Sequence, residues 1–332
     1  MHMNIGLYVL SLVSAFVITT CVLRIIIPKF KAKKIGQMIL EEGPSWHKSK
    51  EGTPTMGGIS FVFASVGIMF LFFLLNISVF DRKESILFFN VIIFCLLNAL
   101  IGAIDDIAKL RKERNKGLSA KAKITLQMII AFLFLLSLHY FVGIDTKIYF
   151  SFLESPIDLG ILFYIFSFFI ICGIINSVNL SDGVDGLAAS QSLCVGIFLS
   201  IISFTVVKNT CLIAISSVLV GGCLGFLIFN RHPAKVFMGD TGSLFLGALI
   251  VSTTFYLNNI FLVILYGFIF VCEAISVILQ VSYFKLTKGK RLFLMTPLHH
   301  HFEKKGWSEN KIVLIFSLVT AISCVASALL VK

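Results

Sequence analysis

The chain has 332 residues, of which 58% are hydrophobic and only 14% are charged, and its formal net charge is +11. Soluble globular domains are closer to half apolar and a quarter charged, so this composition, with a mean hydropathy of +0.97, excludes that class. The apolar residues recur in stretches of about 20, the length that an α-helix needs to cross a bilayer. We therefore expect an all-α polytopic membrane protein that forms a single integral membrane domain over residues 1–332.

The apolar stretches predict about ten transmembrane helices. Only Asn258 and Asn259 separate the eighth expected span from the ninth, and this division decides on which side of the membrane the next loop lies. The segment 144–158 contains KIYFSFL, which favours a small hairpin between the fourth and fifth spans. The expected spans cover residues 5–27, 57–79, 85–104, 122–143, 159–178, 187–207, 210–229, 243–257, 260–284 and 310–331.

Basic residues orient these spans, because Lys and Arg are retained preferentially on the cytoplasmic side. Nearly all of the 28 basic residues fall on one side of the expected topology, the exceptions being Arg82, Lys83, Lys147, Lys208 and Lys332. Both termini are therefore expected outside the cytoplasm. The basic residues are dispersed among membrane loops and form no nucleic-acid-binding module, so nucleic acid is not an expected partner. The expected cytoplasmic loops are residues 28–56, 105–121, 179–186, 230–242 and 285–309.

The first polar motif, DDIAK, ends the third expected span with Asp105 and Asp106. Adjacent helical residues point about 100° apart, which predicts different roles for the two carboxylates. Lys109 lies one turn further on, within reach of Asp105. A helix-end cap with a surface ion pair is the structural alternative. Charged groups at a membrane boundary nevertheless indicate a functional site by default.

The second motif, NLSDGVDG, joins the fifth and sixth expected spans and adds Asn179, Asp182 and Asp185 to the preceding Asn176. Three-residue spacing keeps these side chains near one face if the helix continues through the motif. Capping of the sixth helix is the structural alternative, but one cap requires only one Asp. The motif thus predicts polar groups for a ligand.

The third motif, FMGDTGS, places Asp240 between glycines just before the eighth expected span. This setting suits an oxygen ligand of Mg²⁺, which typically takes one or two carboxylates together with substrate phosphates. A helix cap is again the structural alternative. Phe237 is more often a packing residue than a ligand-binding one, although an aromatic ring beside a phosphate site can stack on a base.

Three consecutive histidines, His299, His300 and His301, lie in the motif TPLHHHFE. Adjacent histidines have poor geometry for one metal ion, because metal sites prefer spaced ligands. We interpret them as donors to phosphate, one of which could orient another group. Glu273 and Gln280 are polar residues within the ninth expected span, where interhelical hydrogen bonds are the usual role, and Gln280 lies close enough to the cytoplasmic end to contact ligand.

Carboxylates, Mg²⁺ and basic donors are the components of a phosphoryl-transfer site. With these components in view, the chain resembles the phospho-N-acetylmuramoyl-pentapeptide-transferase family. The resemblance extends in order through most of the chain and shows no departure at the motif positions. The matching motifs are GTPTMGG at 52–58, DDIAK at 105–109, GLSAKAK at 117–123, NSVNLSDGVDGLA at 176–188, FMGDTGS at 237–243 and TPLHHHFE at 296–303.

The resemblance implies that undecaprenyl phosphate attacks the β-phosphate of UDP-N-acetylmuramoyl-pentapeptide at a bacterial cytoplasmic membrane, forming lipid I and releasing UMP. It implies catalytic roles for Asp105, Asp106 and Asp240, with Asp240 on Mg²⁺ and Asp105 acting on the lipid phosphate. Direct displacement is favoured over a covalent phospho-aspartate. It also implies a homodimer. The substrate-binding residues implied are Lys50, Thr55, Lys109, Lys121, Asn176, Asn179, Asp182, Asp185, Phe237, Gln280, His299, His300 and His301.

Two alternatives come from other readings of the same residues. A sister transferase of the same superfamily transfers N-acetylglucosamine phosphate instead, and the TPLHHHFE form of the histidine motif argues against it. An ion-coupled transporter also uses intramembrane Asp and His residues, but these usually lie near the bilayer midplane, whereas the motifs here lie at one interface.

Overall fold

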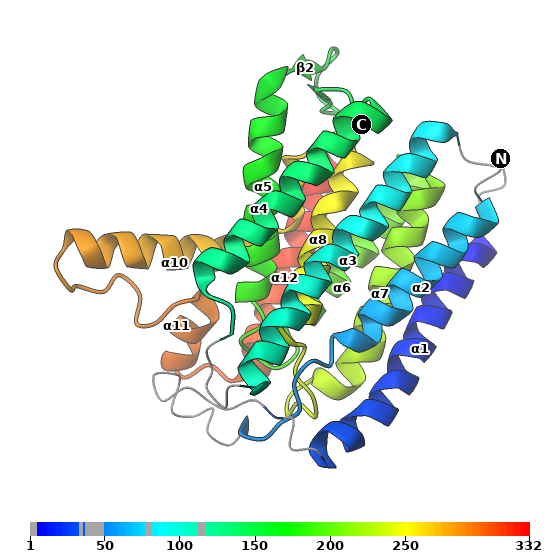
Figure 1. Ribbon diagram of the computed structural model, residues 1–332. Coiled ribbons are helices and arrows are strands. Elements are labelled where there is room, and N and C mark those ends of the chain that lie inside the picture. Colours follow the sequence, from blue (N-terminus) through cyan, green and yellow to red (C-terminus); the bar gives the residue numbers. More distant parts are fainter. Residues whose placement is uncertain (1–4, 33–35, 37–49, 77–80, 112–116) are drawn as a thin grey trace.

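A computed structural model describes residues 5–32, 36, 50–76, 81–111 and 117–332 (Figure 1). It is a helical bundle, as the composition predicts. Among the described residues, nine helices are long and apolar enough to cross a membrane. The multi-pass, all-α prediction is therefore confirmed.

The first four predicted spans are confirmed, with longer helices at two of them. Leu138–Val142 continues the fourth helix as a π-turn, and the side chain of Ser119 caps the start of that helix. The third helix continues past Asp105 and Asp106, so these residues lie within a helix and not at the start of a loop. The four helices are α1 (Ile5–Ala32), α2 (Ile59–Asn76), α3 (Arg82–Arg111) and α4 (Ala120–Ser137).

The predicted hairpin follows α4. Strands β1 (Lys147–Ile148) and β2 (Ile157–Asp158) pair antiparallel, with Lys147 opposite Asp158. They lie beyond the ends of the helices, at the same end of the bundle as the N and C labels in Figure 1. The expectation of a small hairpin within 144–158 is confirmed.

The centre of the bundle is formed by α5 (Ile161–Leu180), α6 (Leu187–Thr205), α7 (Thr210–Asn230) and α8 (Gly239–Ser252). Helix α8 packs mainly against α3 and α5, and every residue from Thr241 to Ser252 is buried. It has only 14 residues, extended by the 3₁₀ turn Thr253–Phe255, which is why it is not among the nine long helices. The eighth predicted span is thus a short helix enclosed by protein.

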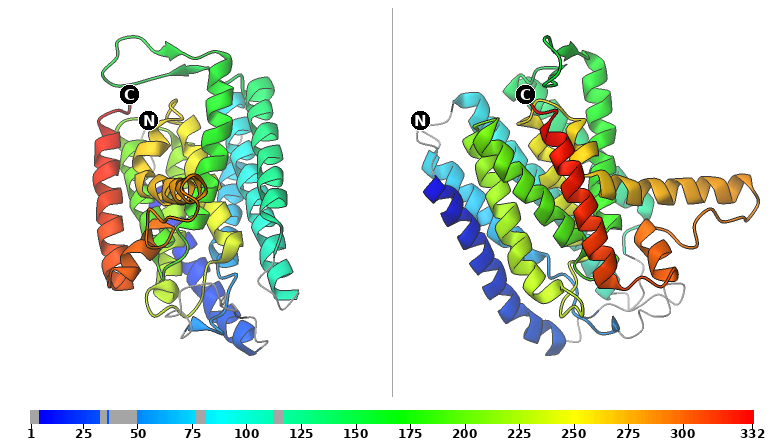
Figure 2. Two further views of the ribbon diagram at one scale, coloured as in Figure 1. Left: turned by 90° about the vertical axis from the view of Figure 1, so that its left-hand side faces the viewer. Right: turned by 180° about the vertical axis from the view of Figure 1, so that it is seen from behind.

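The predicted span over 260–284 is not one continuous helix. The chain forms a short helix α9 (Leu262–Tyr266) and a separate helix α10 (Phe268–Leu286), divided at Gly267. Figures 1 and 2 show α10 projecting sideways from the bundle, across the direction of the other helices. Hydropathy registers only that both segments are apolar, and it does not register the close approach at Gly267, where a methyl group would lie 2.6 Å from the carbonyl oxygen of Val263.

The remaining helices are α11 (Leu298–Lys304), which carries the three histidines, and α12 (Glu309–Ala328). Helix α12 packs against α6 and α9, and the chain labels N and C lie at one end of the bundle (Figure 2). The carboxyl-terminal end of α3 and the helix α11 lie toward the opposite end. Sequence motifs that are far apart in the chain are therefore brought to a common end of the molecule.

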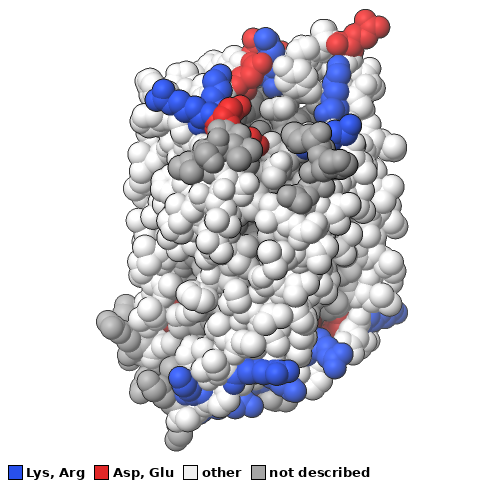
Figure 3. Space-filling model, turned by 90° about the vertical axis from the view of Figure 1, so that its right-hand side faces the viewer, with Lys and Arg blue, Asp and Glu red and all other residues white. Residues whose placement is uncertain are grey.

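Charged side chains are also divided between the two ends of the bundle. Figure 3 shows one face of the molecule, where Lys, Arg, Asp and Glu gather toward opposite ends and leave a broad uncharged band between them. Such a band is what a protein presents to hydrocarbon, because an unpaired charge there is costly. The large apolar side chains exposed on α1, α2 and α4 belong to this lipid-facing surface.

Candidate active site

Asp105 lies on the last turns of α3, with its carboxylate almost fully buried. Its Oδ2 forms an ion pair with Nζ of Lys109 at 2.6 Å, as the i,i+4 spacing predicts. Its Oδ1 accepts a hydrogen bond from the backbone N–H of Leu118 at 2.6 Å. The second bond joins the carboxylate to the segment that leads into α4. Asp105 is therefore fixed from two sides.

Asp106 faces a different partner, as the 100° offset between neighbouring residues predicts. Its Oδ1 accepts the backbone N–H of Asp240 at 3.0 Å, and its Oδ2 accepts the backbone N–H and the hydroxyl of Thr241 at 2.9 and 2.6 Å. These amides are the first of α8, which lack partners within their own helix. Asp106 thus caps α8 from a neighbouring helix, and Asp240 does not cap it.

Asp240 is contacted by side chains from three other helices. Its Oδ2 accepts from the Nζ atoms of Lys109 at 3.0 Å and Lys123 at 2.8 Å, and its Oδ1 accepts from the side-chain amide of Asn179 at 3.0 Å. Asn179 also accepts from Lys123 at 2.9 Å and donates to Ser243. Helices α3, α4, α5 and α8 therefore meet at one carboxylate.

Lys123 is the cationic residue that the sequence interpretation missed. Lys121, which the family resemblance implies, is exposed on α4 and has no described interaction with this cluster. The two lysines are separated by about 200° around the helix, so they cannot face the same carboxylate. The motif GLSAKAK offers both, and sequence spacing alone does not fix the rotation of α4.

The packing around Asp240 depends on glycines. A methyl group on Gly102 in α3 would collide with the carbonyl oxygen of Asp240, and one on Gly58 would collide with the backbone of Gly242. The backbones of α3, α8 and the start of α2 therefore approach one another closely at this point. Close approach of this kind requires residues without a side chain.

The carboxylates of Asp105, Asp106 and Asp240 have oxygen atoms within 4.8 Å of one another. Oxygen donors at this spacing fit a hard cation such as Mg²⁺, which is usually held by one or two carboxylates and by substrate phosphates. All three carboxylates accept bonds from protein groups, but those of Asp106 come from the start of α8, whereas the partners of Asp240 are lysine and asparagine side chains that can turn toward substrate phosphates. The donor set is therefore compatible with the predicted metal.

The second motif forms a turn and not a continuous helix, which corrects the expectation that its polar residues share one helical face. Helix α5 ends at Leu180, and α6 starts after Gly186, whose φ of 80° is left-handed. No side chain caps α6, so the capping alternative is not supported either. Burial and the charges of Asp240 and Asp106 raise the pKa of Asp182 well above its usual range.

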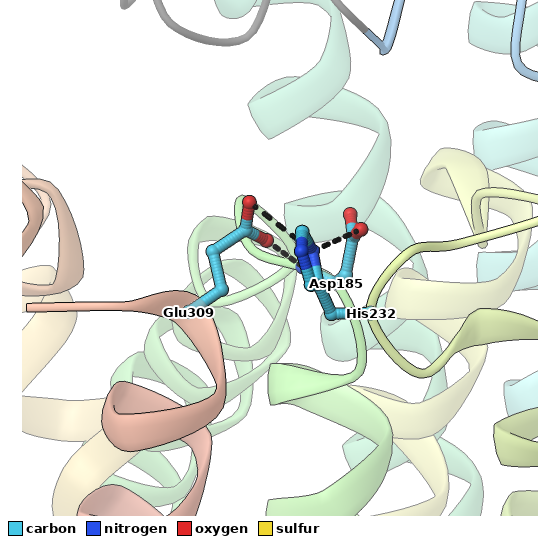
Figure 4. A group of neighbouring side chains, drawn as sticks. All are labelled: Asp185, His232 and Glu309. Atoms are coloured by element: carbon cyan, nitrogen blue, oxygen red, sulfur yellow. Dashed lines mark hydrogen bonds and ion pairs between the residues drawn. The ribbon is translucent and has the colours of Figure 1, made fainter.

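Asp185 belongs to a second cluster. Its carboxylate accepts from Lys50 at 2.7 Å, from His232 at 3.1 Å and from the backbone N–H of Ala234 at 3.0 Å. Glu309, at the start of α12, pairs with the same Lys50 at 2.7 Å and lies 3.5 Å from His232. Figure 4 shows His232 between the two carboxylates. The sequence interpretation named Lys50 and Asp185 but missed His232 and Glu309.

Thr55 and Phe237 lie on two segments that run side by side. The backbone N–H of Phe237 donates to the carbonyl of Pro54 at 2.7 Å, and the carbonyl of Phe237 accepts from Gly57 at 2.8 Å. Both side chains are partly exposed. Asn176 is engaged elsewhere, since its amide donates to Gln127 on α4 at 2.8 Å.

The three histidines face three different partners, as expected for residues that do not share a metal ion. His299 is fully buried and pairs with Glu273 at 3.1 Å, whereas His300 pairs with Glu303 on its own helix. His301 accepts the backbone N–H of Leu294 at 3.2 Å. Gln280 accepts the backbone N–H groups of Leu292 and Phe293, so it holds the loop between α10 and α11.

Comparison with known proteins agrees with this arrangement. The sequence model described as Glycosyl transferase family 4 matches residues 87–258, which include most of α3 and all of α4 to α8. Relatives named phospho-N-acetylmuramoyl-pentapeptide-transferase match over almost their whole length. The protein from Clostridium perfringens strain 13 is 40% identical over 316 residues, covering 95% of this chain and 96% of its own.

Two further relatives with the same name extend the match. The protein from Carboxydothermus hydrogenoformans is 43% identical over 311 residues, covering 92% of both chains, and that from Listeria welshimeri is 41% identical over 329 residues, covering 99% of both. These matches extend over nearly the whole of this chain. The chain belongs to the phospho-N-acetylmuramoyl-pentapeptide-transferase family.

Proposed function

We propose that this enzyme transfers phospho-N-acetylmuramoyl-pentapeptide from UDP-N-acetylmuramoyl-pentapeptide to undecaprenyl phosphate, yielding lipid I and UMP for peptidoglycan synthesis. The observation that carries the proposal is the convergence of Asp105, Lys109, Lys123 and Asp240 at one end of a membrane bundle. Two cations and two carboxylates at a membrane boundary suit a reaction between a water-soluble diphosphate and a lipid phosphate.

In the proposed reaction, an oxygen of the lipid phosphate attacks the β-phosphorus of the UDP-sugar while the bond from that phosphorus to UMP breaks. The ammonium groups of Lys109 and Lys123, which contact Asp240, can turn to the phosphate oxygens of the substrate and offset the negative charge of those oxygens. Asp105, fixed by Lys109 and by the N–H of Leu118, positions the lipid phosphate. That phosphate is largely ionised near neutral pH, so direct displacement needs no strong base.

Mg²⁺ is proposed as the cofactor, held by Asp240 with Asp105 beside it. When bound, it neutralises diphosphate charge and orients the phosphate oxygens. The oxygen donors within 4.8 Å of one another support this assignment. Asp106 is proposed to act by holding the backbone of Asp240 in place, since its own oxygens are occupied by α8.

The nucleoside is proposed to bind beside the second cluster, where Phe237 offers a partly exposed ring and Asp185 and Lys50 offer polar groups. Asn179 and Asp182 lie between the nucleoside and the diphosphate in this arrangement. The histidines of α11 are proposed to contact the sugar–phosphate region. The exposed position of Lys121 leaves it at the rim of the site.

We further propose that the site faces the cytoplasm of a bacterium, that the termini lie outside the cytoplasmic membrane, and that the enzyme is a homodimer. The orientation is supported by the basic residues of the loops at the active-site end. The soluble UDP-sugar is available only on that side. The dimer rests on the family resemblance.

The test uses purified protein, undecaprenyl phosphate and two donors, UDP-N-acetylmuramoyl-pentapeptide and UDP-N-acetylglucosamine, and measures UMP release with and without Mg²⁺. We expect Mg²⁺-dependent release from the first donor alone. Asp240→Asn should abolish it, whereas Asp158→Asn on the distant strand β2 should not. Preferential use of UDP-N-acetylglucosamine would replace the proposal with the sister activity. UMP release without Mg²⁺ would remove Asp240 from its metal role.

A further inference from the structure

Glu273 is a fully buried carboxylate on α10, a helix of otherwise mainly apolar residues. Its Oε1 lies 3.1 Å from Nδ1 of His299, and its Oε2 accepts the backbone N–H of His299 at 3.3 Å. One carboxylate therefore holds both the backbone and the ring of a single histidine. A buried carboxylate is costly without such partners, so this pairing is a specific feature of the fold.

The pairing determines the hydrogen-bonding state of the imidazole. An ionised carboxylate only accepts hydrogen bonds, so Nδ1 of His299 carries the proton that is shared with Glu273. The opposite nitrogen, Nε2, is then the ring atom left to form a hydrogen bond with a ligand. His300 and His301 have different surroundings, because His300 pairs with Glu303 of its own helix and Nδ1 of His301 accepts a backbone N–H.

Nε2 of His299 is buried and has no hydrogen-bond partner among the described residues. It lies against Gly183, where a methyl group would collide with it. Gly183 is partly exposed and directly follows Asp182, so Nε2 lies just beneath the surface of the substrate-binding turn. A buried polar atom without a partner is costly, so a bound molecule is expected to supply the missing bond in the working enzyme.

We propose that Glu273 is a positioning residue for the transfer reaction, holding His299 so that Nε2–H donates to a phosphate oxygen of the bound UDP-sugar beside Asp182 and Gly183. This inference rests on the proposed function and adds a residue to it. The negative charge of Glu273 offsets the positive charge that the imidazole carries when both of its nitrogens donate. Replacing the carboxylate by an amide removes this compensating charge, so the imidazole stays neutral and its Nε2–H becomes a weaker donor to phosphate.

The first test is kinetic. Glu273→Gln keeps the size of the side chain but removes its charge and reverses the bond to Nδ1, so kcat should fall by roughly 10- to 100-fold or more while the protein remains folded. Glu84→Gln is the matched control, because Glu84 also joins two helices, through Asn209 at 2.9 Å, at the other end of the bundle. It should leave kcat within about twofold of the wild type.

A double-mutant cycle distinguishes positioning from a separate structural role. If Glu273 acts through His299, the double variant Glu273→Gln/His299→Asn should be no slower than His299→Asn alone. Multiplication of the two single losses would overturn the proposal, as would a Glu273→Gln enzyme with wild-type kcat. If Glu273→Gln does not fold, Glu273→Asp serves instead, and it should retain more activity than Glu273→Ala.

A spectroscopic measurement makes the test independent of catalysis. In ¹⁵N-histidine-labelled protein, the His299 resonances, assigned by their loss in His299→Asn, should show a proton on Nδ1 in the wild type and on Nε2 alone in Glu273→Gln. Unchanged resonances would contradict the positioning role. If the wild type fails to release UMP from either donor but the resonances change as expected, the proposed reaction is wrong and the pairing of Glu273 with His299 stands.

Discussion

Asp106 holds the backbone of Asp240, because its Oδ1 accepts the N–H of Asp240 at 3.0 Å. With Thr241 bonded to the other oxygen, the carboxylate anchors the start of α8 to α3. The negative charge also suits the amino-terminal end of a helix, where the backbone dipole is positive. The two neighbouring aspartates thus have different roles, since Asp105 pairs with Lys109 and Asp106 holds the start of α8.

The first prediction concerns this cap. Asp106→Asn places an amide donor against backbone donors, so it should destabilise the protein by about 1–2 kcal/mol and reduce UMP release at least tenfold by displacing Asp240. Thr241→Val removes only the hydroxyl bond and should have a smaller effect on both. Thermal unfolding and steady-state turnover measure the two quantities. Equal effects of the two variants would show that the backbone bonds to Asp106 are dispensable.

The second prediction concerns the close approach of α3 and α8. Gly102→Ala places a methyl group against the carbonyl of Asp240 and should lower both stability and turnover, by about 1–3 kcal/mol in stability. Gly67→Ala is the matched control, because that glycine lies within α2 with open space around it and alanine favours helix. The melting temperature of each variant is the measurement. A Gly102→Ala protein as stable as Gly67→Ala would show that the helices separate without cost.

The third prediction distinguishes two lysines of one motif. Lys123→Met removes a cation that contacts Asp240 at 2.8 Å and should reduce kcat by about 10²-fold or more. Lys121→Met changes an exposed side chain and should reduce it only slightly. Measuring kcat and KM for both variants tests the assignment. The reverse order of effects would mean that α4 rotates when substrate binds.

The fourth prediction concerns pH. Burial and nearby carboxylates raise the pKa of Asp182 well above its usual range. A raised carboxyl pKa favours the protonated form in the folded state, so the associated stability is present at low pH and is lost as pH rises through the folded-state pKa. In EDTA, Asp182→Asn should therefore match the wild type near pH 4 and melt at a higher temperature above the folded-state pKa. A difference in melting temperature that does not change with pH would show that the carboxyl of Asp182 is not the titrating group.

Much of the fold was predictable because apolar length alone determines which segments can cross a bilayer. The break at Gly267 was not, since hydropathy does not register a change of backbone direction. The meeting of Asp105 and Asp240 could be expected from their place at helix ends on one side of the membrane. The choice between Lys121 and Lys123 could not, because it depends on the rotation of α4 within the bundle.

Contacts between motifs were the least accessible to sequence reasoning. Glu273 could be recognised as an unusual charge within an apolar segment, but its partner lies 26 residues further on, across a turn of unpredictable path. Glu309 gave still less signal, because an acidic residue in the first turn of a helix is common. Both pairings follow from how α10, α11 and α12 pack and not from local sequence.

The second cluster, which joins Lys50, Asp185, His232 and Glu309, affects the order in which the protein assembles. Lys50 precedes α2, Asp185 precedes α6, His232 precedes α8 and Glu309 opens α12. During synthesis these four groups leave the ribosome in that order, so Glu309 is the last of them to be made. The assembled cluster cannot form until α12 has been made and inserted. A nascent chain halted before α12 would thus leave Lys50 and His232 with Asp185 as their one carboxylate partner in this cluster.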